Sequence, residues 1–230
     1  MQGYTSKIKD WPETERPRER LLNHGPDILS DSELVGIILR TGNTKTSAMD
    51  LARHLLHKFG GLRGLDTQPV SVLCAEYGIG LAKAAQLKAA LELAKRLVQQ
   101  QWSNKEKLNT SEDAYKYLHL RLRDLSREEF RVVFLTSRNQ VIAEKTLFEG
   151  SLRESVVSPR EIIVAALQLS AAAVILLHNH PSGDPNPSRE DKLVTDKISK
   201  ACRYADINVL DHIIVGRDAY FSFADEGIMT

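Results

Sequence analysis

The spacing of apolar residues changes character about half-way along the chain. In the first part, apolar residues recur three and four positions apart, which predicts helices over residues 30–41 and 47–59. Ser30 with Glu33 three positions later is a capping box, and Gly42 and Gly60 end the two helices. In the second part, short apolar runs typical of strands alternate with helical patterns, which predicts an α/β structure.

A glycine turn separates a short helical stretch from a long alanine- and leucine-rich one. Gly78-Ile-Gly80 followed by Lys83 predicts a unit like a helix-hairpin-helix. Gly78 and Gly80 would let backbone N–H groups approach a phosphate, with Lys83 as the counter-charge. The alternative is a tight connection between two helices that pack their alanine faces, and the sequence leaves both interpretations open.

A polar stretch over residues 99–107 divides the chain into a helical domain, residues 1–104, and a second domain, residues 105–230. Residues 130–136 and 141–148 are predicted to form a hairpin, and helices are predicted to begin at Ser111, Pro159 and Ser188. Further strands are predicted over residues 172–178, 207–215 and 219–223. These elements favour a mixed sheet whose central strand is buried on both faces.

Composition narrows the class of protein only slightly. The formal net charge of +1 argues against a strongly electrostatic nucleic-acid binder. Two isolated cysteines, Cys74 and Cys202, are typical of a reducing compartment. The chain shows no signal-peptide core and no apolar run of the roughly 18 residues that a membrane span needs. We therefore expect a cytoplasmic protein without a membrane partner.

The chemistry of the chain is concentrated in residues 172–191. An apolar strand ends at His178-Asn-His180, a rigid loop with three prolines follows, and Asp191 lies in the first turn of the next helix. Side chains two apart on a strand share a face, so the two histidines should converge. Two imidazoles and one carboxylate form a zinc site with a position open to water, as hydrolytic zinc enzymes have.

Two of these residues, and His212 further along the chain, also have a simpler interpretation. Ser188 and Asp191 form a Ser-x-x-Asp capping pattern, which would explain both residues without a metal. The hydroxyl of Ser188 could also donate to an oxyanion beside a metal. His212, preceded by Asp211, is interpreted as a core histidine with local hydrogen bonds rather than as a metal residue.

The spacing His178-x-His180, seven residues, Ser188, two residues, Asp191 resembles the complete signature of the JAMM (MPN-type) metalloproteases. The resemblance extends along nearly the whole chain to the bacterial RadC proteins, through blocks at residues 16–22, 29–34, 150–152, 159–161, 210–216 and 220–227. It implies an N-terminal all-helical domain with a helix-hairpin-helix and a C-terminal MPN domain of cytidine-deaminase-like architecture. Ser158 stands where many members carry histidine, and a serine caps a helix at least as well.

The resemblance also implies a catalytic glutamate just before a strand. Either Glu128 or Glu129 fits this position by local pattern, and the family's Glu-x-Phe pattern selects Glu128. A Zn²⁺ ion held by His178, His180 and Asp191 would activate water, with Glu128 as general base and Ser188 as oxyanion donor.

Three functions follow as hypotheses. The first is a zinc-dependent hydrolase of the metallopeptidase or isopeptidase type that acts on a protein or peptide. The second is a DNA-associated RadC protein, with DNA binding or a nuclease role in repair or recombination through the N-terminal domain. The third is a zinc scaffold without catalysis, against which the complete set of metal ligands argues.

Overall fold

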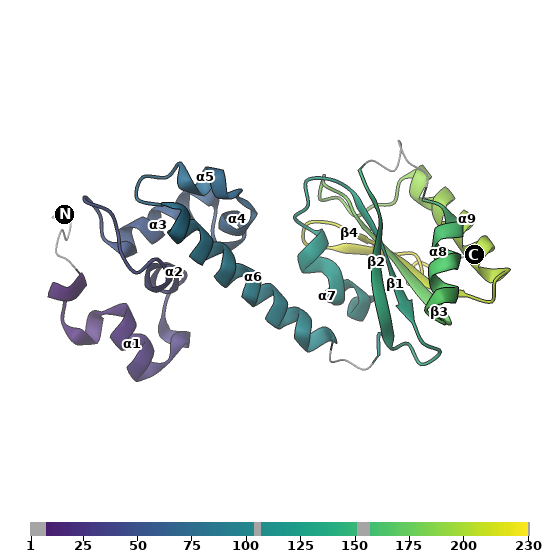
Figure 1. Ribbon diagram of the computed structural model, residues 1–230, viewed down its shortest axis with the longest axis horizontal. Coiled ribbons are helices and arrows are strands. Elements are labelled where there is room, and N and C mark those ends of the chain that lie inside the picture. The colour runs from purple at the N-terminus through teal and green to yellow at the C-terminus, as the bar shows by residue number, and fades with distance from the viewer. Residues whose placement is uncertain (1–7, 104–106, 151–156, 230) are drawn as a thin grey trace. The chain divides into compact units, whose positions relative to one another are not determined.

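The computed structural model describes residues 8–103, 107–150 and 157–229 (Figure 1). The chain divides into two compact units, Met1–Arg96 and Leu97–Thr230. Helix α6 (Leu81–Ser103) runs through this division, so residues 99–103 of the expected linker are helical, and residues 104–106 lie outside the described residues. The expected domain boundary after residue 104 stays a prediction.

Helices form the first unit. They are α1 (Pro17–His24), α2 (Asp31–Leu39), α3 (Ala48–Phe59), α4 (Leu62–Thr67), α5 (Val70–Cys74) and most of α6, with short 3₁₀ turns at Ile8–Asp10, Glu13–Glu15 and Pro26–Ile28. Capping boxes begin α2 at Ser30 and α3 at Ser47, because each serine accepts from the backbone three residues later while the acidic side chain there accepts in return. Leucines from α2 to α6 fill the core, among them Leu39, Leu55, Leu65, Leu73 and Leu87.

A five-stranded mixed sheet forms the centre of the second unit. Its strands are β1 (Glu129–Leu135), β2 (Val141–Glu149), β3 (Ala173–Asn179), β4 (Asn208–Val215) and β5 (Tyr220–Ser222), in the order β2-β1-β3-β4-β5. β3 pairs antiparallel with β1 and parallel with β4. All seven residues of β3 are buried, as an uninterrupted apolar run predicts for a central strand.

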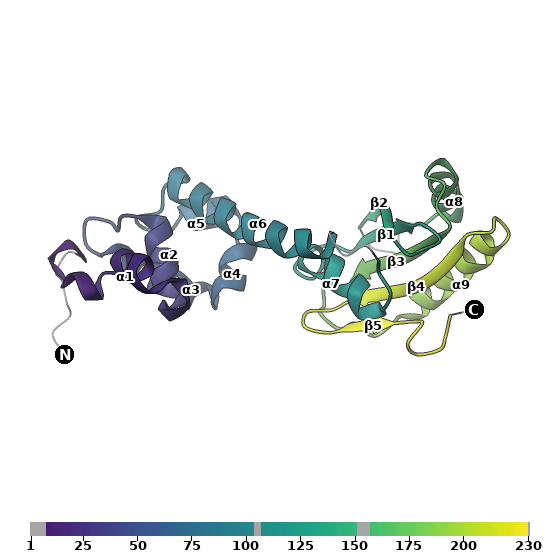
Figure 2. The same ribbon diagram turned by 90° about the horizontal axis from the view of Figure 1, so that it is seen from below.

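Helices cover both faces of this sheet. Figure 1 shows α7 (Ser111–Leu122) on one side and α8 (Pro159–Gln168) with α9 (Arg189–Arg203) on the other. Alternate residues of the strands therefore contribute to different cores: Val133 and Leu177 pack in the α7 layer, and Phe130 and Leu176 pack in the α8 and α9 layer. The turned view in Figure 2 shows the same sheet from below.

The predicted fold class is confirmed: a helical N-terminal unit precedes an α/β unit with a mixed sheet. One local detail differs. Ser158 occupies the N-cap of α8, but its side chain makes no capping hydrogen bond, and Pro159 at the first position begins the helix. Within residues 8–103, 107–150 and 157–229, every helix is too short or too polar to cross a membrane.

Candidate metal centre

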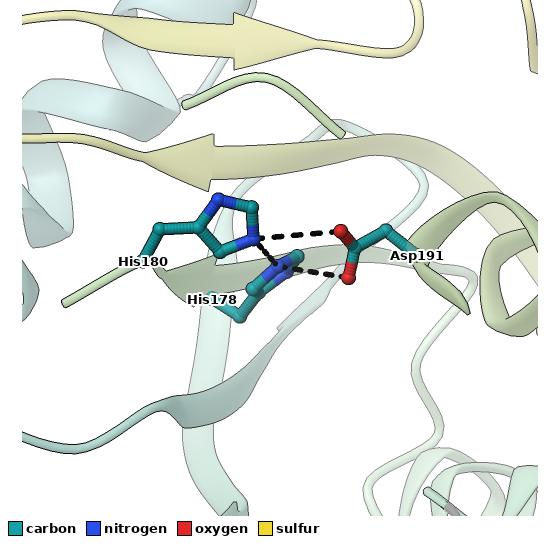
Figure 3. A group of neighbouring side chains, drawn as sticks. All are labelled: His178, His180 and Asp191. Carbon is teal, nitrogen blue, oxygen red and sulfur yellow. Dashed lines mark hydrogen bonds and ion pairs between the residues drawn. The ribbon is translucent and has the colours of Figure 1, made fainter. Parts of the chain in front are cut away.

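The two histidines converge at the carboxyl end of β3, where open α/β sheets place their ligands. His178 lies in β3 and is fully buried, and His180 follows the strand by one residue with 13% of its side chain exposed. Their Nε2 atoms are 3.0 Å apart (Figure 3). Solvent therefore reaches this pair from the side of His180.

Asp191 closes the group from the first turn of α9. Its Oδ1 lies 3.2 Å from Nε2 of His178, and its Oδ2 lies 3.4 Å from Nε2 of His180. Ser188, the N-cap of α9, donates to Oδ2 with its backbone N–H at 2.7 Å and with its hydroxyl at 2.6 Å. Asp191 thus completes the capping box and faces the histidines with the same carboxylate, so its capping role does not exclude a role at a metal.

The residues fit a four-coordinate metal ion. Metal bonds of about 2.0–2.1 Å in a tetrahedron place neighbouring donor atoms about 3.3 Å apart. Here the two Nε2 atoms are 3.0 Å apart, and they lie 3.2 and 3.4 Å from the two different oxygens of Asp191. One donor atom from each of the three residues lies within 4.8 Å of the others. Among the histidine, cysteine and acidic side chains that the structure describes, these three form the group whose donor atoms lie close enough together to hold a metal ion.

The electrostatics of His178 and Asp191 favour the forms that bind metal. Burial lowers the pKa of His178, although the Asp191 carboxylate acts in the opposite direction. Burial alone would raise the pKa of Asp191, but hydrogen bonds with His178, His180 and Ser188 hold it well below its usual range. At neutral pH, Asp191 is therefore ionised and His178 is neutral, as metal ligands must be.

The loop after β3 orients the second histidine. Nδ1 of His180 lies 2.7 Å from the backbone carbonyl oxygen of Asp184. A carbonyl can only accept a hydrogen bond, so Nδ1 carries the proton and donates it. The lone pair of the neutral imidazole is then on Nε2, the atom that faces Asp191.

The strand register separates the two glutamates that the sequence left as alternatives. Phe130 pairs with His178 across β1 and β3, and its ring stacks on the imidazole. Glu128, two residues before Phe130, is on the histidine side by strand alternation, and Glu129 is on the α7 side. The carboxylate of Glu129 accepts from the guanidinium of Arg131 and from the hydroxyl of Thr146.

Electrostatics also connect Glu128 with the centre. Burial, the largest influence on either ring, lowers the pKa of His178 below its usual value. Burial also acts to lower the pKa of His180, but the hydrogen bonds to Asp191 and Asp184 outweigh it and raise that pKa. The negative charge of Glu128 raises both values, in the same direction as Asp191. The role of Glu128 as general base stays a prediction, and so does the oxyanion role of Ser188.

His212 is a residue of this centre that sequence reasoning placed elsewhere. It is fully buried, as expected of a core histidine, but its Nε2 lies 2.8 Å from Nδ1 of His178. Thirty-four positions separate the two histidines, and the parallel pairing of β3 with β4 brings them together. The sequence feature that could have drawn attention to His212 is the polar pair Asp211-His212 inside an apolar strand. This pair does not by itself identify which residue His212 contacts.

The residues predicted to contact nucleic acid lie in the first unit, at the turn between α5 and α6. The ammonium group of Lys83 donates to the carbonyl oxygens of Gly42 and Gly78 at 2.7 and 2.8 Å. Gly78 has a φ of +95°, and a Cβ there would lie 2.7 Å from Cβ of Asn43. Gly80 is exposed. Lys83 and Gly78 therefore join this turn to the loop after α2. Their predicted contact with nucleic acid stays a prediction.

Comparison with known proteins places both units. The family model described as the RadC-like JAB domain matches residues 108–228, and the one described as UPF0758 N-terminal matches residues 8–85. The mixed sheet with paired histidines at the end of its central strand is thus that of a JAB domain. The chain belongs to the family of RadC-like proteins that carry the UPF0758 N-terminal region.

Relatives match over almost their full length. A UPF0758 protein of Aeromonas hydrophila is 48% identical over 220 residues, covering 96% of this chain and 98% of the relative. One of Nitrosospira multiformis is 46% identical over 222 residues, covering 96% of this chain and 99% of the relative. One of Methanosarcina barkeri is 44% identical over 223 residues, covering 97% of each. These names identify a family and state no activity.

Proposed function

We propose that this protein is a zinc-dependent hydrolase of the metallopeptidase or isopeptidase type. The observation that carries the proposal is the placement of the Nε2 atoms of His178 and His180 beside solvent, 3.0 Å apart, with each within 3.4 Å of a carboxylate oxygen of Asp191. Three protein ligands are the number that leaves a coordination position for water. The match to the RadC-like JAB domain adds support for hydrolysis.

A bound zinc ion would lower the pKa of a water molecule and polarise a carbonyl group. His178, His180 and Asp191 would hold it through two neutral imidazoles and one carboxylate. The choice of zinc rests on this donor set, because imidazole nitrogen is a preferred ligand of zinc, whereas magnesium and calcium take oxygen ligands.

Glu128 supplies the base in this proposal. It accepts a proton from the attacking water and returns it to the leaving amine. Its position two residues before Phe130, on the side of the sheet that His178 faces, supports this role. The commitment of Glu129 to Arg131 and Thr146 argues against the alternative.

Ser188 would act on the oxygen that becomes negatively charged during the attack. Its hydroxyl donates to Oδ2 of Asp191 at 2.6 Å, so it lies beside the donor atoms of the centre. Donation to an oxyanion requires this hydroxyl to rotate, while the backbone N–H of Ser188 keeps the cap on Oδ2 at 2.7 Å. The cap would therefore survive the rotation.

The test is hydrolysis by the full chain loaded with zinc. Pools of peptides, isopeptide-linked peptides and nucleic acids are incubated with wild type and with Glu128→Gln, and products are identified by mass spectrometry. We expect cleavage of an amide bond by wild type and loss of at least about 100-fold in rate for the variant. Glu129→Gln is the matched control, because it removes the same charge on the opposite side of the sheet.

Cleavage of nucleic acid alone would replace the peptidase proposal with a nuclease. Equal rates for wild type and Glu128→Gln would remove Glu128 from the mechanism. Absence of any cleavage, with zinc bound, would favour the scaffold.

A further inference from the structure

A line of hydrogen-bonding groups leads away from the centre through the buried side of His178. Nδ1 of His178 lies 2.8 Å from Nε2 of His212, and Nδ1 of His212 lies 2.6 Å from the hydroxyl oxygen of Thr195. That hydroxyl lies 2.5 Å from the backbone carbonyl oxygen of Asp191. The line thus begins and ends on residues of the metal centre.

With both imidazoles neutral, only one arrangement of protons satisfies every contact. The carbonyl of Asp191 can only accept, so the single proton of the Thr195 hydroxyl is donated to it. Thr195 then accepts from Nδ1 of His212, which leaves Nε2 of the neutral His212 ring without a proton. Nε2 of His212 in turn accepts from Nδ1 of His178.

The consequence falls on the metal-facing atom of His178. A neutral imidazole that carries its proton on Nδ1 has its lone pair on Nε2, and this is the atom that faces His180 and Asp191. In the reverse arrangement, a proton on Nε2 would occupy the direction of the metal. The direction in which the hydrogen bonds of this line run therefore decides whether Nε2 of His178 can bind a metal ion.

The acceptor for His178 differs in kind from that for His180. Nδ1–H of His180 donates to the backbone carbonyl of Asp184, and a carbonyl oxygen can only accept a hydrogen bond. A histidine can either accept or donate at Nε2, so a further group is needed to fix which of the two His212 does. Thr195 is 2% exposed and His212 is fully buried, so water does not compete for these atoms.

Aromatic packing holds the two rings in line. Phe130 stacks on His178 with ring centres 5.9 Å apart, and Phe223 stacks on His212 with ring centres 5.0 Å apart. The planes are inclined by 13° and 19°, so each imidazole lies almost parallel to a phenyl ring. Packing fixes where the rings lie, and the hydrogen bonds fix which nitrogen is protonated.

We propose that His212 and Thr195 are positioning residues, which hold His178 in the tautomer whose Nε2 binds the metal. This inference deepens the proposed function and rests on it, because it concerns the same zinc site. Groups that hold the other nitrogen of a metal-binding histidine typically contribute 10- to 100-fold to metal affinity.

Thr195 offers the sharpest test, because valine keeps its shape without the hydroxyl and serine keeps the hydroxyl without the methyl group. Thr195→Val removes the hydroxyl, whereas Thr195→Ser keeps it. We expect the zinc affinity of the full chain, measured by competition with a chelator, to fall about tenfold or more in the valine variant. The serine variant should stay within about threefold of wild type.

His212 offers a rescue. In His212→Gln, a side-chain carbonyl can accept from Nδ1 of His178 without help from Thr195, whereas His212→Phe offers no acceptor. We expect about 10- to 100-fold weaker zinc binding for the phenylalanine variant and near wild-type binding for the glutamine variant. Adding Thr195→Val to His212→Gln should then cost little further affinity, because the two residues act through one line.

A spectroscopic readout on the metal-free protein separates tautomer from packing. Long-range ¹H–¹⁵N correlation spectra should show Nδ1 protonated and Nε2 unprotonated in His212 of wild type. Phe223→Leu, which disturbs the stacking and keeps every hydrogen bond, should leave this pattern unchanged. Circular dichroism of each metal-free variant confirms that it is folded.

A His212 protonated on Nε2 would overturn the inference, and so would equal zinc affinities for Thr195→Val and Thr195→Ser. Either result would leave the zinc hydrolase proposal intact, because wild type would still bind zinc and act through Glu128. A wild type that binds no zinc would end both proposals. The two failures are therefore distinguishable.

Discussion

Ser188 donates both its backbone N–H and its hydroxyl to one oxygen of Asp191, and the other oxygen faces His178. The first turn of α9 is thus built by the same carboxylate that completes the candidate metal centre. Capping holds the carboxylate in place before any metal arrives, because Asp191 N–H donates back to the Ser188 hydroxyl at 3.1 Å.

Substitution of Asp191 should separate the two uses of its carboxylate. We expect wild type to contain about one zinc ion per chain by elemental analysis, as a single site predicts. Asp191→Asn should lose the zinc and keep α9, because an amide oxygen can still accept from Ser188 while its NH₂ group turns a donor toward His178. His178→Ala should lose the zinc as well. Full retention of zinc in both variants would contradict the site.

Ser188→Ala should have a stability effect and a catalytic effect that can be told apart. Loss of the cap should lower the free energy of unfolding by about 1 kcal/mol. Ser47→Ala is the control, because Ser47 caps α3 through the same arrangement with Asp50, far from the centre in sequence. Both variants should lose similar stability in urea titrations. Only Ser188→Ala should lower the hydrolytic rate, by about 100-fold or more, and equal rates would remove Ser188 from the chemistry.

Glu129→Gln should destabilise the protein without affecting zinc. Glu129 is 8% exposed, and its carboxylate accepts from Arg131 and Thr146, so the substitution weakens charged hydrogen bonds by about 1 to 3 kcal/mol. Glu128→Gln should also keep its zinc, but with near wild-type stability and the loss of hydrolytic rate expected above. Thermal unfolding with elemental analysis tests both variants, and a loss of zinc from Glu129→Gln would mean that the register argument is wrong.

The thiol of Cys202 should be unreactive in the folded protein. Burial raises its pKa to about 11, and the reactive form of a cysteine is the thiolate. The thiol therefore stays protonated at pH 8, and folding stability should decline as pH rises from about 9 toward 11, where only the unfolded chain ionises readily. Titration with a thiol reagent at pH 8 should give the same native count for wild type and Cys202→Ala. A lower count for the variant would contradict the prediction.

Lys83→Met should destabilise the first unit. The ammonium group donates to two backbone carbonyls, and charged hydrogen bonds of this kind contribute about 1.5 to 3 kcal/mol each. Lys95→Met is the control, because Lys95 pairs with Asp66 as a partly exposed ion pair worth under about 1 kcal/mol. Urea unfolding followed by circular dichroism measures both. Equal stability of the two variants would mean that Lys83 is free for other partners, such as the DNA phosphates suggested by the sequence.

Local features of this protein could be predicted from the sequence because they depend on neighbours along the chain. The helix starts at Ser30, Ser47 and Ser188 follow from a side chain that caps a backbone group three residues later. The candidate metal donors are equally local, since His178 and His180 are separated by one residue and Asp191 follows within fourteen positions. Their convergence needs only a strand, a loop and a helix in succession.

Contacts between strands required the tertiary structure. The sequence left Glu128 and Glu129 open because both precede β1, and a shift of one residue in the pairing of β1 with β3 would exchange their faces. The observed pairing of Phe130 with His178 assigns the faces. The same limitation applied to His212, whose neighbour on β3 depends on how two parallel strands align.

The sequence by itself therefore determined which residues make up the candidate metal centre, because their spacing along one strand–loop–helix segment is enough to bring their side chains together. Only the tertiary structure decided which residues support that centre from other strands. Hydrogen bonds between His178, His212 and Thr195 join β3, β4 and α9, and no local pattern encodes the alignment of three separate elements.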